Sequence, residues 1–193
     1  MMGGFKKNLN LKNVTNKNIS SCLYSLNEDV ISHSINLLET KIKFKPLYTN
    51  SHFFLIQFFE KFFAFLPSFV YFNDQYVLYF LPSHKNRLIN AKYSTKKTAF
   101  FRKFTKKISF INYNEPVKLN LLVLNLFPHI PIHFLEYKIE ETDSNLISIY
   151  VFAKECHLKF ALGRKGAYIK TINDLMHSSL DQRITLFIRS IGE

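Results

Sequence analysis

Two glycines three residues apart constrain this chain more than any other feature of its sequence. They lie in the stretch Phe160–Ile172, FALGRKGAYIKTI, although the whole chain has only five glycines among 193 residues. Glycine readily adopts the positive φ angles that end a helix or start a tight turn. The stretch therefore predicts a helix that ends at Gly163, a loop that carries Arg164 and Lys165, and a second helix that begins at Ala167.

The residues around this loop predict an α+β unit that spans residues 115–193. Helical and strand periodicities alternate along it, and Pro128 stops its first helix. The predicted elements are a helix at 115–127, strands at 133–141 and 146–154, a helix at 155–162, the glycine loop, a helix at 167–180 and a strand at 183–190. The predicted order is therefore helix, strand, strand, helix, loop, helix, strand.

The glycine loop has the chemistry of a phosphate-binding site. Glycine has no Cβ, so a phosphate can approach backbone N–H groups closely, and the start of a helix presents unpaired N–H groups with a positive partial charge. The alternative interpretation is an ordinary helix C-cap at Gly163 followed by a tight turn at Gly166. The residues predicted to bind RNA at the loop are Lys159, Gly163, Arg164, Lys165, Gly166, Tyr168 and Lys170.

Positive charge is concentrated upstream of this unit. The chain carries 26 Lys and Arg against 14 Asp and Glu, a formal net charge of +12, which favours a polyanionic partner such as nucleic acid. Residues 75–114 contain no acidic residue, and aromatic residues are interleaved with the cations there. We predict an RNA-contacting arm in this segment; the alternative is a solvated arm with a few packing aromatics. Its predicted RNA-binding residues are Lys96, Lys97, Arg102, Lys103, Lys106 and Lys107.

The rest of the Phe-rich N-terminal region, 1–114, contains the most apolar stretch of the chain, Ser51–Phe72. Glu60 and Lys61 lie at the middle of this stretch and Pro67 interrupts it, so no run of about 18 apolar residues is available to span a membrane. Helical spacing predicts a core helix, with a membrane-surface helix as the alternative. The expected broad buried stripe consists of Phe54, Phe58, Phe62 and Leu66 beside Leu55, Phe59 and Phe63.

Sequence motifs for catalysis or metal binding are absent. There is no GxxxxGK[ST] P-loop and no GxSxG nucleophile motif. His129 and His133 are four residues apart, but two nearby prolines prevent the helix that would place them on one face. Cys22 and Cys156 belong to no CxxC pair. We therefore expect a protein that is not an enzyme and has no cofactor, metal or small-molecule substrate.

The loop and its surroundings resemble the type II K-homology (KH) domain. Leu162 directly precedes the loop and Ile169 follows it three residues later, which is similar to the family's apolar-G-x-x-G-x-x-apolar signature. The resemblance covers roughly residues 115–193. It implies that the loop clamps the backbone of about four nucleotides. It also implies that the bases lie along an apolar groove beside the loop. Candidates for its wall are Ala167, Tyr168 and Ile169, with a core position as the alternative for Ile169.

Two families with this domain are similar to the chain. Ile19–Tyr24, ISSCLY, resembles the N-terminal motif of the KH-bearing small-subunit ribosomal protein number three, which binds rRNA in the head of the small subunit. Residues 116–141 and 159–172 resemble the KH region of Era-type GTPases, which binds the end of small-subunit rRNA. Since the chain has no P-loop, its architecture favours the ribosomal component.

The amino-acid composition adds an indication of compartment. The chain has 21 Phe and no Trp, a bias typical of an AT-rich genome such as an organellar one, although an AT-rich nuclear genome is also compatible. We expect an rRNA-binding structural component of the mitochondrial small ribosomal subunit, with small-subunit rRNA and neighbouring ribosomal proteins as partners and no membrane. An Era-like assembly factor without the GTPase domain is the second possibility, and a free RNA-binding regulator the third.

Overall fold

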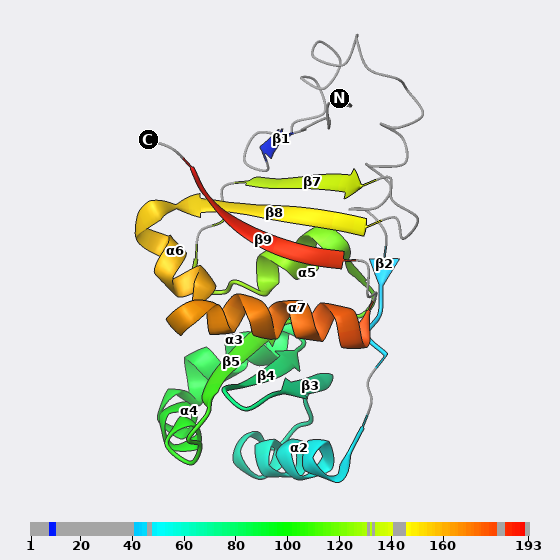
Figure 1. Cartoon of the computed structure of the whole chain (residues 1–193). Coiled ribbons are helices and arrows are strands. Elements are labelled where there is room, and N and C mark those ends of the chain that lie inside the picture. Colours follow the sequence, from blue (N-terminus) through cyan, green and yellow to red (C-terminus); the bar gives the residue numbers. More distant parts are fainter. Residues whose placement is uncertain are drawn as a thin grey trace, which may run out of the picture.

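The chain has an α+β fold in a computed structural model that describes residues 8–10, 41–45, 48–130, 132, 134–140, 146–180 and 184–191 (Figure 1). The ISSCLY segment at 19–24, Cys22 and His133 lie outside these described residues. In chain order, the described elements are β1 (Asn8–Asn10), β2 (Lys41–Ile42), α2 (Asn50–Phe63), β3 (Phe69–Phe72), β4 (Tyr76–Leu81), α3 (Ser83–Lys92), α4 (Ser94–Phe101), β5 (Lys107–Asn112), β6 (Val117–Lys118), α5 (Leu119–Asn125), β7 (Phe134–Glu140), β8 (Leu146–Lys154), α6 (Glu155–Leu162), a 3₁₀ turn (Arg164–Gly166), α7 (Ala167–Ser179) and β9 (Ile184–Ile191).

Two consecutive segments of the chain fold with the same order of elements. The first unit runs α2, β3, β4, α3, α4, β5, and the second runs α5, β7, β8, α6, α7, β9. In each unit the first two strands pair antiparallel, and a helix pair leads to a third strand that lies parallel to the second. The sheet orders are accordingly β3-β4-β5 and β1-β7-β8-β9. The chain therefore contains an internal structural repeat.

The sheet of the first unit is covered on both faces. All six residues of its central strand, β4, are buried, as expected for a strand enclosed by two layers. Since side chains alternate along a strand, Val77, Tyr79 and Leu81 share a core with α2, α3 and α4. The intervening residues Tyr76, Leu78 and Phe80 share a second core with α5 and α7.

Helix α7 joins the two units, because it lies between their sheets (Figure 1). Its buried residues Tyr168, Ile172 and Leu175 belong to the same core as β4 of the first unit and as Ile149 and Leu186 of the second. The predicted boundary at residue 114 falls between β5 and β6. The two units nevertheless share one continuous apolar core.

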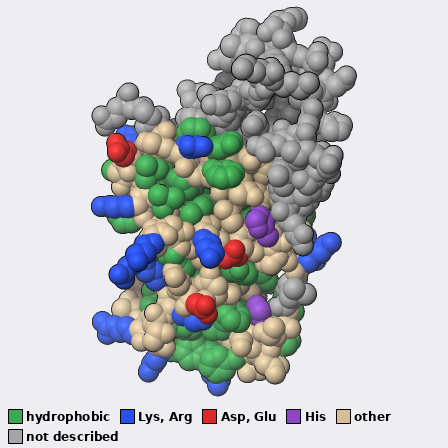
Figure 2. All heavy atoms as spheres, viewed as in Figure 1, with side chains coloured by type: hydrophobic (Ala, Val, Ile, Leu, Met, Phe, Trp, Pro, Cys, Tyr) green, Lys and Arg blue, Asp and Glu red, His purple; other side chains and the backbone are tan. Residues whose placement is uncertain are grey.

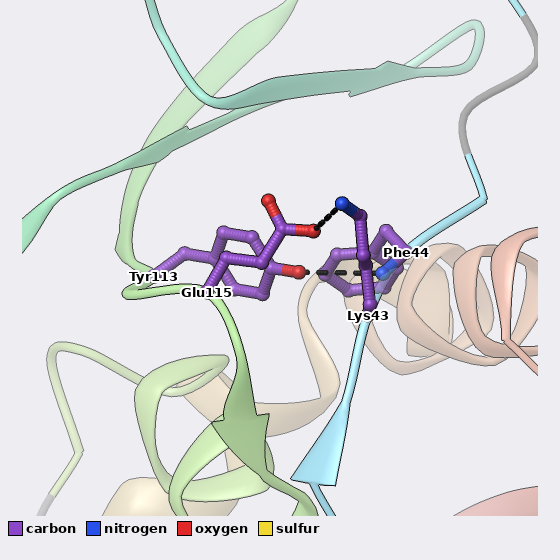
Figure 3. Close-up of polar contacts among 4 residues, drawn as sticks. All are labelled: Lys43, Phe44, Tyr113 and Glu115. Carbon is purple, nitrogen blue, oxygen red and sulfur yellow. Dashed lines mark hydrogen bonds and ion pairs between the residues drawn. The ribbon is translucent and has the colours of Figure 1, made fainter.

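The segment 41–45 also connects the two units (Figure 3). Strand β2 pairs antiparallel with β6, and the Phe44 ring stacks on Phe69 of the first unit at 4.9 Å between centroids. The Phe44 backbone N–H donates to Tyr113 Oη at 3.3 Å, and Lys43 Nζ lies 2.8 Å from a carboxylate oxygen of Glu115. Since that ion pair is exposed, we attribute the stability of this connection to the buried Phe44 ring.

The Phe-rich helix is a core helix, as predicted. Helix α2 buries Leu55, Phe59 and Phe63 against β4 and the following helices. The expected stripe was too broad, because Phe54 and Leu66 are 64% and 55% exposed. Among the described residues, no helix has the length and apolar character that crossing a membrane requires.

The basic segment 75–114 is folded, so the prediction of an arm was wrong. It contains β4, the helices α3 and α4, and β5. Two apolar side chains anchor its helices, since Ile89 and Phe100 are completely buried. The many lysines around these anchors remain outside the core, which concealed the helical periodicity in the sequence.

Helix α2 has a pH-sensitive N-terminus. The Thr49 backbone N–H donates to Nδ1 of His52 at 3.1 Å, which requires that this nitrogen carry no proton. Burial lowers the pKa of His52. The stabilisation is therefore complete above the unfolded-state pKa of about 6.5 and is lost as pH falls through the lower folded-state pKa.

We expect acidification from pH 7.5 to 5 to destabilise the protein through this cap, because a protonated Nδ1 cannot accept the Thr49 hydrogen bond. His52→Gln is the matched control, because glutamine can still accept the hydrogen bond and does not titrate. Urea unfolding of both proteins at the two pH values measures the difference. An equal loss in the two proteins would mean that other groups cause the pH dependence.

Candidate nucleic-acid interface

The predicted glycine loop forms between α6 and α7. Helix α6 ends where the Gly163 N–H donates to the Lys159 carbonyl at 3.0 Å. Gly163 has φ 72° and ψ 178°, Lys165 has φ 53°, and Gly166 has φ 73°. Positive φ at three of the four loop residues reverses the chain within one 3₁₀ turn, and glycine meets this requirement without a steric cost at two of them.

The N-terminus of α7 is available to an anion. Gly166 is its N-cap residue, and within the described structure no side chain caps this end and no acidic residue lies in its first turn. The first N–H of α7, on Ala167, donates to the Arg164 carbonyl of the preceding turn. The next N–H groups of a helix start have no partner within the helix and carry a positive partial charge. Arg164 and Lys165 are exposed directly beside them. Backbone donors and cationic side chains therefore converge at one place.

The two glycines have different surroundings. A Cβ on Gly163 would lie 2.8 Å from Tyr168 Cβ, 2.9 Å from the Tyr168 nitrogen and 2.9 Å from Tyr76 Oη. A Cβ on Gly166 would meet nothing within 4 Å. Gly163 thus holds the loop tightly against the protein, whereas Gly166 leaves open space on the side from which a ligand would approach.

Tyr168 belongs to the core, which corrects its prediction as an RNA-binding residue. Its side chain is only 8% exposed, and its hydroxyl donates to the Leu126 carbonyl. Its ring packs against Tyr76 of the first unit, with 5.2 Å between centroids, and against Phe127. Burial raises the pKa of the Tyr168 hydroxyl, so the group remains a neutral donor. Tyr168 therefore positions the loop and does not face RNA.

Contacts between the two units fix the position of the loop relative to the first sheet. The Asn73 side-chain amide donates to Thr171 Oγ1 in α7 at 2.8 Å, and Lys106 Nζ donates to the Asn73 carbonyl at 2.6 Å. Lys107 Nζ lies 5.7 Å from the centre of the Tyr76 ring. The structure therefore brings Lys106 and Lys107 to the same junction as the loop. No sequence pattern predicted the contacts of Tyr76, Asn73 and Thr171.

The remaining predicted cations fall into two groups. Lys159 and Lys170 are exposed on the helices that flank the loop. Lys96 and Lys97 lie on α4, and Arg102 and Lys103 follow its last residue. Figure 2 shows lysine and arginine side chains along the edge of the molecule where Figure 1 places α6 and α4. The loop and α4 therefore contribute cations to one side of the molecule.

Metal-binding groups are not gathered in the part of the chain that the structure describes. No cluster of three or more His, Cys, Asp or Glu side chains occurs there. Cys156 is an exposed free thiol on α6, and His129 is exposed beyond α5.

Comparisons with known proteins provide information on the fold. No protein-family model matches the chain, and no curated protein matches its sequence. A solved structure titled "Crystal structure of APE1850" is similar with a TM-score of 0.56, and the match covers 74% of this chain and 100% of that chain at 15% identity. This likeness is one of fold alone. Because residues 115–193 are less than half of the chain, the match extends beyond the second unit.

Proposed function

We propose that this protein is an rRNA-binding structural component of the mitochondrial small ribosomal subunit. The observation that carries the proposal is the open side of Gly166, where the uncapped start of α7 meets the exposed Arg164 and Lys165. A phosphate group fits this combination of backbone donors and cations. The backbone of single-stranded rRNA supplies such groups in succession.

The strand pairing of the second unit supports a type II KH assignment. Its order is the one that the resemblance implies, with the glycine loop between α6 and α7. Strand β7 pairs antiparallel with β8, and β8 pairs parallel with β9. The helix pair α6 and α7 connects β8 to β9 along the chain. We therefore assign the loop to the backbone of about four nucleotides, as in other domains of this kind.

The first unit offers a surface for neighbouring ribosomal proteins. Phe53 and Phe54 on the outer side of α2 are 52% and 64% exposed, and Tyr48 stacks on Phe53 with 5.6 Å between ring centroids. Exposed aromatic side chains of this kind are enriched at protein interfaces. This aromatic group on α2 lies on the first unit, whereas the loop belongs to the second.

A charge-only substitution at Gly166 tests the role of the loop. Asparagine and aspartate both tolerate a left-handed backbone and both cap helices, so Gly166→Asn and Gly166→Asp differ mainly by one negative charge. We expect Gly166→Asp to weaken binding to single-stranded small-subunit rRNA fragments at least about fivefold, and Gly166→Asn to change it less than about twofold. Fluorescence anisotropy at fixed salt measures both. Equal affinities of the two variants would remove the loop from the site.

Binding should also weaken steeply with salt. If Lys159, Arg164, Lys165 and Lys170 each neutralise one phosphate, the slope of log K against log salt concentration should be about −3 for a single strand. Titrations at potassium chloride concentrations from about 50 to about 300 mM measure this slope. A slope near zero would indicate a role through protein contacts alone.

An assembly factor is the second candidate, favoured by the similarity of residues 116–141 and 159–172 to Era-type KH regions. Sedimentation separates the two. We expect the protein at stoichiometric levels on mature small subunits. Its presence on precursor particles alone would favour the assembly factor.

A further inference from the structure

The first unit contains a pocket beside the junction of α3 and α4. Its volume is about 320 Å³, and its walls include Asn86, Asn90, Lys97, Phe101, Phe110 and Asn112. In the internal repeat, this junction corresponds to the glycine loop between α6 and α7. Tyr93 alone connects the two helices, so the first unit has no room for a loop of the same kind. It has instead a pocket lined by side chains of both helices and of β5.

Two asparagines leave a donor and an acceptor in this pocket. The Asn86 amide donates to the Asn112 side-chain oxygen at 2.7 Å. Among the described residues, the Asn86 oxygen and the Asn112 amide nitrogen have no other partner. If both amides were turned round, one nitrogen and one oxygen would still be left, because the pair is symmetric. The edge of an unpaired nucleobase offers a matching acceptor and donor.

Aromatic and cationic groups complete the pocket. The rings of Phe101 and Phe110 meet at 5.2 Å in an edge-to-face arrangement. Lys97 Nζ lies 5.8 and 5.7 Å from the centres of these rings, and it donates to the Asn90 side-chain oxygen at 2.7 Å. Aromatic faces stack with bases, and an ammonium at the rim attracts phosphate.

The pocket also borders the residues that follow α5. Pro128 and His129, which follow the last turn of α5, form its remaining wall and are exposed. The preceding residue, Phe127, packs against Tyr168 with 6.0 Å between ring centroids. Tyr168 is the residue against which Gly163 packs. The loop and the pocket are therefore connected through the buried residues Phe127 and Tyr168.

We propose that this pocket binds one unpaired base of a single-stranded RNA through the Asn86–Asn112 pair and stacks it on Phe101. The glycine loop holds the backbone of the same RNA without regard to sequence, and the pocket supplies base preference. The proposal rests on the proposed function, since the loop brings the RNA to the pocket. Each of the four bases presents a different arrangement of donors and acceptors, so the bound base is the one that fits the asparagine pair.

Nucleoside monophosphates test the pocket independently of the loop. We expect titration of the full ¹⁵N-labelled chain with AMP, CMP, GMP and UMP to shift the side-chain amide signals of Asn86, Asn90 and Asn112, with one nucleotide preferred at least about fivefold. Asn112→Leu should weaken that binding at least about fivefold. Asn120→Leu, at a half-buried asparagine outside the pocket, should leave it unchanged. The absence of pocket shifts with all four nucleotides in the unsubstituted chain would overturn the proposal.

Lys97→Met provides a second variant, because its side chain lies at the rim and the change keeps the apolar stem. We expect it to weaken nucleotide binding at least about threefold, since one charged contact is lost. Oligonucleotides then separate the two hypotheses. Gly166→Asp should weaken binding of all homopolymers equally, and Asn112→Leu should remove the difference between them. If Gly166→Asp weakens binding but Asn112→Leu keeps the preference among homopolymers, the pocket proposal alone is overturned. If nucleotides shift the pocket signals but Gly166→Asp does not weaken binding, the loop proposal alone is overturned.

Discussion

Gly163→Ala should destabilise the protein by about 3 kcal/mol or more, the largest stability effect that we expect from a single methyl group in this chain. The backbone of Gly163, at φ 72° and ψ 178°, lies in a region that is almost restricted to glycine. The new Cβ would also lie 2.8 and 2.9 Å from Cβ and nitrogen of Tyr168. Neither atom can move without shifting α7, which is packed between the two sheets.

Gly166→Ala is the matched control for this prediction. Gly166 also has a positive φ, but its ψ of 13° places it in the ordinary left-handed region, and a Cβ there meets no atom within 4 Å. We expect a loss of about 1 kcal/mol at Gly166, from backbone strain alone. Urea unfolding of both variants measures the difference. Equal losses would show that the contact with Tyr168 contributes nothing, and that Gly163 is required only for its backbone conformation.

The second unit could be predicted from sequence because its signals are local. The helix at 155–162 and the strand at 146–154 begin and end at the predicted residues, and the helix after the loop differs by one residue at its end. Glycines, prolines and alternating apolar residues mark these boundaries directly in the sequence. The predicted helix at 115–127 was wrong at its start, because residues 117–118 form strand β6, which pairs with β2, and the helix begins only at Leu119. Local sequence patterns were sufficient to predict those elements whose ends are marked by neighbouring residues in the chain.

The first unit could not be predicted in the same way. Its helices α3 and α4 meet at Tyr93, with no glycine to mark the junction. Its third strand, β5, pairs parallel with β4 across a connection of two helices, and parallel pairing has no local turn signal. The repeat therefore becomes visible only when the strand pairing is known. In the sequence, glycines mark the junction of the two helices in the second unit, but no glycine marks the corresponding junction in the first.

Tyr168 shows the same limit within the candidate site. A tyrosine next to a glycine loop suggested a groove wall, but contacts with Tyr76 and the Leu126 carbonyl place its side chain in the core. Leu126 is 42 residues away in the chain, and Tyr76 is farther still. Which of several aromatic residues near a loop faces inward depends on such distant partners. Arg164 and Lys165 are exposed, and their binding to RNA stays a prediction.

Replacing both Arg164 and Lys165 with aspartate should abolish RNA crosslinking at the loop and weaken binding at least about tenfold. Two cations beside the start of α7 become two anions, which reverses the local attraction for phosphate. The fold should persist, because both side chains are exposed and aspartate tolerates the left-handed backbone at Lys165. Photocrosslinking with mass spectrometry locates the contact, and anisotropy measures the affinity.

Lys45→Asp combined with Lys61→Asp is the control, since it changes the net charge by the same amount. The Lys45 N–H donates to the Ser179 carbonyl at the opposite end of α7, and Lys61 lies on α2, beyond the first sheet from α7. We expect this control to retain loop crosslinks and to lose no more than about threefold in affinity, because charges beyond a Debye length of about 8 Å are screened. Equal losses in the two double variants would mean that net charge, and not the loop, attracts the RNA. Unchanged crosslinking in the Arg164 and Lys165 variant would exclude the loop outright, leaving the pocket of the first unit to be tested with mononucleotides by itself.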